Sequence, residues 1–120
     1  MTHSYSALEN ELRHRFRNDL NHAGESHDVE NAFAFTVRTL LVRALDDSLR
    51  FTDNDIRLLP NDAVHYRLAE VITTAAPFQA ASADSDLLVI IGRFAEEASH
   101  RYKSLHEHAD KIRAREHKEH

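Results

Sequence analysis

Glutamate and histidine near the end of the chain have the spacing of a metal-binding helix. Residues 96–120 read EEASHRYKSLHEHADKIRAREHKEH and contain five of the ten histidines, with Glu97 one helical turn before His100. A Glu-x-x-His pair binds metal in di-iron four-helix proteins, where both side chains project into the bundle. The pair therefore predicts a metal site only if both side chains point toward the inside of a bundle.

The apolar pattern of the same segment indicates that Glu97 and His100 lie on the solvent side of the helix. Apolar residues recur in steps of three and four, which is typical of a heptad seam: Leu88, Ile91, Ala95, Ala98, Tyr102, Leu105, Ala109 and Ile112. In this register Glu97 and His100 point away from the seam. A second pair, Glu11 and His14, likewise lies opposite the apolar stripe of its own helix. We interpret both pairs as solvated helix faces rather than metal ligands.

The end of the chain supports a separate metal hypothesis. Glu116, His117 and His120 are spaced so that their side chains could share one divalent ion such as Zn²⁺ or Ni²⁺. No surrounding residues are evident that would orient these ligands, so the site is an alternative to the main hypothesis. A weaker cluster, His22 with Glu25 and His27, lies between the first two helices.

Other kinds of chemistry find little support, and the sequence predicts neither a catalytic residue nor a cofactor. Cysteine is absent, and no G-x-S-x-G motif is present. Asp53-Asn-Asp55 resembles the start of a calcium loop, but Arg57 stands at the next ligand position and no closing Glu follows. An acid–base role for His65 with Asp19 or Glu70 is possible but has no supporting motif. The sequence thus leans away from an enzyme.

Composition excludes several classes of protein. The chain has 120 residues and a formal charge of −5, so it predicts one domain without the basic excess typical of nucleic-acid binding. Its longest apolar run, Leu87–Ile91, is too short to cross a membrane. The polar N-terminus is unlike a signal peptide, and with the lack of cysteine it predicts a cytoplasmic protein. Arginine outnumbers lysine twelve to three, which favours a bacterial source.

Hydrophobic periodicity predicts an all-α fold, an up-and-down-like bundle of four helices with a long C-terminal helix. The four expected helices cover residues 4–22, 28–45, 61–76 and 83 to about 115. Pro77 is expected to end the third helix, and 78–83 to form a turn. The run DLLVII could be a buried strand, but it has no evident partner strand and is assigned to the fourth helix. The whole chain, 1–120, is one domain, with a frayed end over about 110–120.

Two apolar surfaces remain without a partner in this bundle. Phe35 and Val42 form a second apolar face on the second helix, and the last helix is longer than a compact domain of this size. A parallel homodimer through the seam would set Arg101 against His106 and His108 against Arg113, contacts that are neutral or repulsive. The seam therefore needs a helix with acidic or neutral flanks, in the same chain, in a second copy or in another protein.

These surfaces predict a small non-catalytic helical protein that acts through protein–protein contacts and forms a homodimer. The predicted contact residues are Phe35, Val42, Ala98, Tyr102, Leu105, Ala109 and Ile112. No nucleic-acid or membrane partner is predicted.

Overall fold

The protein is mostly helical, with a short two-stranded sheet inserted between its second and last long helices. This computed structural model describes the backbone of residues 4–118 and the side chains of residues 4–107. Helices account for 69% of the chain. The elements are α1 (Ser6–His22), α2 (Ser26–Ala44), the 3₁₀ turn η1 (Asp53–Asp55), β1 (Ile56–Leu58), β2 (Tyr66–Leu68), α3 (Glu70–Thr73), α4 (Ala76–Ala83) and α5 (Leu87–Lys118).

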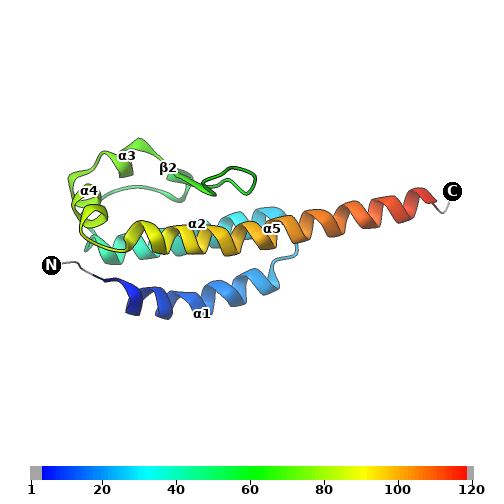
Figure 1. The fold of residues 1–120 in the computed structure, drawn as a ribbon, viewed down its shortest axis with the longest axis horizontal. Helices are drawn as coiled ribbons and strands as arrows, with labels where there is room; N and C mark the ends of the chain where they lie inside the picture. Colours follow the sequence, from blue (N-terminus) through cyan, green and yellow to red (C-terminus); the bar gives the residue numbers. More distant parts are fainter. Residues whose placement is uncertain (1–3, 119–120) are drawn as a thin grey trace.

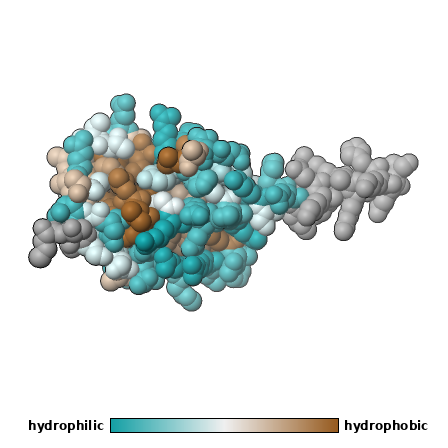
Figure 2. Space-filling view, in the orientation of Figure 1, coloured by the Kyte–Doolittle hydropathy of each residue, from teal (hydrophilic) through white to brown (hydrophobic). Residues whose placement is uncertain are grey.

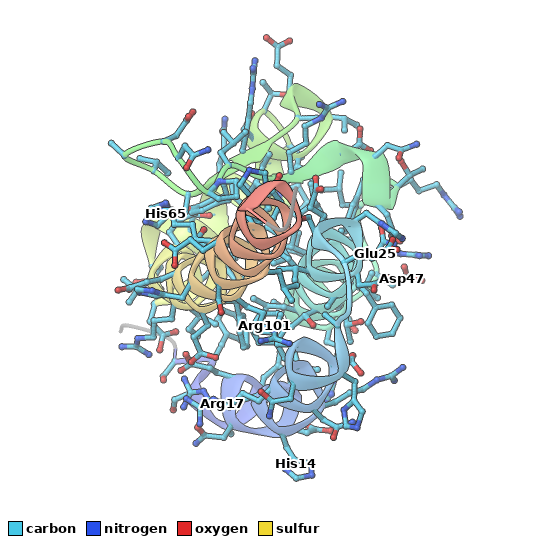
Figure 3. The ribbon with its side chains drawn as sticks, turned by 90° about the vertical axis from the view of Figure 1, so that its right-hand side faces the viewer. His14, Arg17, Glu25, Asp47, His65 and Arg101 are labelled. Carbon is cyan, nitrogen blue, oxygen red and sulfur yellow. The ribbon has the colours of Figure 1, made fainter. Side chains whose placement is uncertain are left out.

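Helices α2 and α5 form the middle layer of the molecule. Helix α1 covers one side of this pair, and the β1–β2 hairpin with α3 covers the other (Figures 1 and 3). Helix α1 turns directly into α2 through three residues, so these two helices are antiparallel. Contacts between α1 and α5 join Tyr5 to Asp86 at one end and Leu20 to Arg101 at the other, so α1 and α5 are parallel. Helix α2 is therefore antiparallel to both, and its last residue, Ala44, contacts Tyr5 close to the start of α5. Residues 45–86 connect these two neighbouring helix ends and contain the hairpin, α3 and α4.

The core lies where the three long helices meet. Phe16 of α1, Phe33 of α2 and Phe94 of α5 are almost wholly buried. The rings of Phe16 and Phe94 meet edge to face, with centroids 5.0 Å apart and planes at 72°, an arrangement that aromatic quadrupoles favour. The apolar residues that the sequence assigned to α1 and α2 thus face one another as expected.

The predicted third helix over 61–76 is wrong. Residues 56–68 form an antiparallel hairpin in which Ile56 pairs with Leu68 and Leu58 with Tyr66. Ile56, Leu58 and Leu68 are buried on its inner face, while Val64 is 62% exposed in the loop. Apolar residues at both helical and alternating spacing occur here, and packing against α2 selects the alternating set.

The region after the hairpin also differs from the prediction. Helix α3 ends at Thr73, and Pro77 lies in the first turn of α4 instead of ending a helix. Proline suits this place because the first helical N–H groups need no intrahelical acceptor. Phe78, expected in a turn, is a buried residue of α4. The expected up-and-down-like four-helix topology is therefore replaced by three long helices, two short ones and a hairpin within the described residues.

Helix α5 is continuous and runs far beyond the helices that cover it. Its 32 residues correspond to about 48 Å, against about 26 Å for the 17 residues of α1. Figure 1 shows its C-terminal half extending past the ends of α1 and α2. The DLLVII run is helical, as predicted. The buried stripe contains Ile91, Ala95 and Ala98 of the predicted seam. It is wider than the seam, because Leu87, Ile90 and Phe94 are also buried, and Leu88 is 43% exposed. No helix of the described chain has the length and apolar content to cross a membrane.

Replacement of a core aromatic residue should be costly. Phe94→Ala removes a buried ring that packs against Phe16 and leaves a cavity, so we expect a loss of about 3–5 kcal/mol in the free energy of unfolding, measured by urea denaturation. Val64→Ala serves as the control, because this side chain is exposed in the hairpin loop, and we expect it to change the value by less than about 0.5 kcal/mol. Equal effects of the two substitutions would contradict this account of the core.

Candidate functional site

A buried carboxylate joins α1 to α5. Glu9 of α1 is only 3% exposed, and each of its oxygens meets a different arginine. Arg13, one turn further along α1, donates to Oε2 at 2.7 Å, and Arg93 of α5 donates to Oε1 at 2.9 Å. Both bonds are charge-assisted, which makes a buried carboxylate tolerable. The sequence analysis missed Glu9; the signal was an acid beside the apolar stripe, four residues before an arginine.

A second carboxylate fixes the beginning of both helices. Asp86 directly precedes α5, and its side chain accepts a hydrogen bond from the Tyr5 backbone N–H at 2.8 Å and from the Ser4 hydroxyl at 3.1 Å. The Tyr5 N–H holds the pKa of Asp86 below its ordinary value, since the bond favours the ionised form. The Tyr5 hydroxyl donates to the Ala44 carbonyl at 3.3 Å, so the same residue also reaches the end of α2.

A third set of polar contacts surrounds a hollow of about 450 Å³ at the other end of α1. Arg17 donates to both oxygens of Glu97, at 3.0 and 3.3 Å. Arg101 donates to the Leu20 and Ala23 carbonyls at 2.9 and 3.1 Å and so satisfies the free carbonyls at the end of α1. Figure 3 shows Arg17 and Arg101 between the two helices. These charges pair with each other or with backbone, which describes a helix junction rather than a catalytic site.

The two Glu-x-x-His pairs lie at the surface of the protein. Glu97 is not simply solvated as expected, because it is bound to Arg17 across the α1–α5 junction, whereas His100 is exposed. Glu11 accepts a hydrogen bond from Arg43 of α2 at 3.0 Å, and this contact lowers the pKa of Glu11. His14 points away from the molecule (Figure 3). Neither pair faces a second ligand pair.

The other titratable residues singled out in the sequence are also separated. The His22 ring contacts the Asn18 carbonyl at 2.8 Å, and His27 lies 3.0 Å from Glu25, so their cluster is divided between two helices. Asp19 pairs with Arg15 at 3.8 Å on α1, and both side chains of this pair are exposed to solvent.

The acid–base hypothesis for His65 fails for one of its two partners. The hairpin that carries His65 and the helix that carries Asp19 cover opposite sides of the α2–α5 layer (Figure 3). Glu70 is exposed at the start of α3, and no hydrogen bond joins it to His65 among the described residues. The Nδ1 atom of His65 is buried without a hydrogen-bond partner in this part of the chain.

A metal site is not visible in the described part of the chain. No group of three or more His, Asp or Glu side chains within residues 4–107 is arranged to hold an ion. Glu116, His117 and His120, the ligands predicted for Zn²⁺ or Ni²⁺, lie outside the described side chains. Their role as ligands stays a prediction.

The predicted contact residues occupy three different environments. Ala98 is fully buried in the core of its own chain, so it is not available to a partner. Phe35 is 40% exposed on α2, where the Arg15 guanidinium covers its ring at 4.7 Å, and Val42 is half-buried. The side chains of Ala109 and Ile112 lie outside the described residues.

Tyr102 and Leu105 continue the buried stripe of α5 at the point where the helix leaves the body of the protein. Both are half-buried and lie against the edge of the core. The rings of Tyr102 and His106 stack in near-parallel planes, with centroids 6.4 Å apart. Beyond Arg101, which closes the end of α1, the apolar side of α5 has lost the helices that cover it further back (Figure 1). This is the surface that most resembles an interaction site.

Comparison with known proteins gives no match. No protein-family model matches it, and neither a curated protein nor a solved structure matches it significantly. Function must therefore be argued from the residues and their arrangement.

Loss of the buried acid should destabilise the fold. Glu9→Gln keeps the shape of the side chain but leaves Arg13 and Arg93 without their common anion, so we expect a loss of about 1–3 kcal/mol in the free energy of unfolding, measured by urea denaturation. Glu96→Gln is the matched control on the exposed side of α5, and its effect should stay within about 0.5 kcal/mol. A neutral Glu9→Gln would show that the two bonds do not secure α1.

The Asp86 contact should make stability depend on pH. Because its pKa is lowered in the folded chain, the ionised carboxylate stabilises the fold above the ordinary value of 3.8, and this contribution is lost as pH falls through the lowered folded pKa. Asp86→Asn should therefore lower stability at pH 7, and its difference from the wild type should shrink progressively below pH 4. Thermal unfolding followed by circular dichroism from pH 7 to 3 measures this. A difference that does not change over that range would contradict the assignment.

Proposed function

We propose that this chain is a non-catalytic protein that acts through helix-mediated contacts and forms a homodimer. One observation carries the proposal: α5 is nearly twice as long as the helices that cover it, and its apolar stripe does not stop where they end. Tyr102 and Leu105 lie on that continuation, only half-buried. A helix that needed only its own chain would have become polar on all sides after Arg101.

Burial of these side chains supplies a driving force for association. Complete removal of a large apolar side chain from water is worth about 1.5–3 kcal/mol, and Tyr102 and Leu105 retain part of that amount. The sequence places Ala109 and Ile112 at the next positions of the same heptad pattern. The projecting half of α5, residues 102–118, is thus the contact element of the proposal.

The Phe35 and Val42 face is a second possible contact of the homodimer. Its exposed area is smaller than the sequence suggested, because Arg15 lies over the Phe35 ring. Association through this face would displace or rearrange that cation–π contact, which stabilises the free chain by a modest amount. The projecting half of α5 is therefore the stronger candidate of the two.

Sedimentation equilibrium at micromolar concentration tests the proposal. The wild-type chain is expected to be a dimer, and the double variant Tyr102→Glu, Leu105→Glu a folded monomer, because two buried carboxylates would replace apolar contacts. Ser104→Glu adds a charge at a nearby exposed position of α5 and should leave the dimer intact.

Two results would contradict the proposal in different ways. A wild-type chain that is monomeric at these concentrations would exclude the homodimer. A dimer that survives the double variant but dissociates with Phe35→Glu, Val42→Glu would move the contact to α2. Circular dichroism of each variant confirms that the helices remain folded.

A further inference from the structure

The hairpin leaves one edge of its strand β1 without a partner strand. The Leu59 N–H donates to the His65 carbonyl at 2.7 Å, and bonded pairs alternate along an antiparallel ladder. The backbone groups of Ile56 and Leu58 therefore point away from β2. The Ile56 N–H donates to the Asp53 carbonyl. The Leu58 N–H and the carbonyls of Ile56 and Leu58 have no hydrogen-bond partner within the described chain.

A groove of about 340 Å³ lies along this edge, between β1 and α2. Its strand side comes from residues 56–59 and, among the described residues, from none of β2, so the groove lies on the side of β1 away from β2. The other side is formed by three residues of α2: Glu30, Asn31 and Ala34. An ion pair of 3.1 Å between Arg38 and Asp53 holds the 3₁₀ turn against α2 beside the start of β1. The groove thus gives an extended chain access to the unpaired backbone groups.

Two arginines lie side by side on the outer face of the hairpin. Arg57 pairs directly with Arg67 across the strands, and both side chains are exposed. Neither makes an ion pair with a described residue, and like charges at such positions lower the stability of a sheet. A second hollow of about 340 Å³ beside them is also lined by Asn54 and Glu70. In Figure 2 the side chains that project on the hairpin side are mostly hydrophilic, whereas a hydrophobic area lies over the beginning of α5.

These arginines disfavour a second copy of β1 at the free edge. Two-fold antiparallel pairing that uses the outward groups of both Ile56 and Leu58 would place Arg57 directly opposite the same residue of the other copy. Its guanidinium groups would add to the existing repulsion between Arg57 and Arg67. A strand with a carboxylate at that position would instead accept charge-assisted hydrogen bonds from the arginines.

We propose that the free edge of β1 binds an extended peptide segment of another protein, with an acidic residue opposite Arg57. The segment would add a third strand, which accepts a hydrogen bond from the Leu58 N–H and donates to the carbonyls of Ile56 and Leu58. Side chains alternate between the two faces of a strand, so the acidic side chain would point to the outer face, beside both arginines. Its two neighbours would point inward, toward Asn31 and Ala34 on α2. None of the residues that form this surface belongs to the projecting half of α5.

The carboxylates near the groove limit the charge of the segment. Asp53 is bound to Arg38, and Asp55 accepts a hydrogen bond from a backbone N–H at 2.8 Å. Glu30 and Glu70 are exposed and make no ion pair with a described residue. Glu30 would repel a second acid on the inner side, and Glu70 would compete with the first for the arginines. The segment should therefore carry one acidic residue between neutral ones.

Two capped synthetic peptides, Thr-Val-Glu-Val-Thr and Thr-Val-Lys-Val-Thr, test the inference. The glutamate peptide should shift the backbone amide NMR signals of residues 56–58 saturably and bind about threefold or more tightly than the lysine peptide. Arg57→Glu should remove this preference, and Glu70→Gln should strengthen binding of the glutamate peptide. Arg50→Glu is the matched control, because Arg50 is exposed and lines neither hollow, and it should leave the preference unchanged.

A substitution on α2 tests whether the groove itself is the site. Asn31→Trp places a large ring in the groove from an exposed position and should lower the affinity for the glutamate peptide by about tenfold or more. Asn18→Trp makes the same change at an exposed position of α1, across the molecule from the hairpin, and should leave the affinity unchanged. Circular dichroism of each variant checks that the chain remains folded.

The contradicting results differ in what they overturn. No saturable shift at residues 56–58 with the glutamate peptide, or binding that survives Asn31→Trp, overturns docking at this edge. Equal affinity for the two peptides, or a preference that persists in Arg57→Glu, overturns the acidic partner. A Leu58 signal that shifts with protein concentration in the absence of peptide would assign the edge to a second copy. The sedimentation experiment on α5 is independent of all these results.

Discussion

The buried carboxylate of Glu9 is the contact on which the arrangement of the long helices depends. A charge that is 3% exposed is tolerated only when its oxygens are bound, and here they are bound by Arg13 from the same helix and Arg93 from α5. This requirement fixes the rotation of α5 about its own axis, because only one face of the helix can present Arg93 to Glu9. Asp86 and Arg101 add contacts before and after it, so the parallel pairing is defined along the length of α1.

The rotation of α5 decides which residues can act. With Arg93 turned toward α1 and Ile90, Ile91 and Phe94 turned into the core, Val89 must face outward. The same rotation carries the buried stripe forward to Tyr102 and Leu105, past the point where Arg101 closes α1. Helix α5 thus forms the centre of the core in its first half and carries Tyr102 and Leu105 at the edge of that core. The proposed self-association follows from the difference in length between α5 and its neighbours.

Sequence reasoning was successful where one pattern had one structural interpretation. Stripes such as Phe16 and Leu20 in α1, or Phe33 and Leu40 in α2, occur at helical spacing only, and both helices are present with nearly the expected bounds. The segment 56–76 was ambiguous, since Leu68 and Ile72 fit a helical stripe while Ile56 and Leu58 fit an alternating strand. Local propensity differs too little between these alternatives to select one, so packing against α2 decides.

The candidate site was predictable only in part for a similar reason. Outward placement of the two Glu-x-x-His pairs follows from counting residues along a helix, and His100 and His14 are exposed as counted. The pairing of Glu97 with Arg17, or of Glu9 with Arg93, joins residues about 80 positions apart and depends on which helices become neighbours. Helical periodicity predicts the face of the helix on which a residue lies. It does not predict which other helix packs against that face.

The sequence by itself determined that the chain is mostly helical, that it lacks cysteine chemistry and the common catalytic motifs, and that its last helix is long and carries an apolar stripe. These properties depend on composition and on the regular rise of a helix. The tertiary structure alone decided that α1 and α5 are parallel, that a hairpin replaces the expected third helix, and that Ala98, predicted as a contact residue, is buried in its own core. These outcomes depend on burial, which is shared among residues distant in the chain and is settled only when all of them pack together.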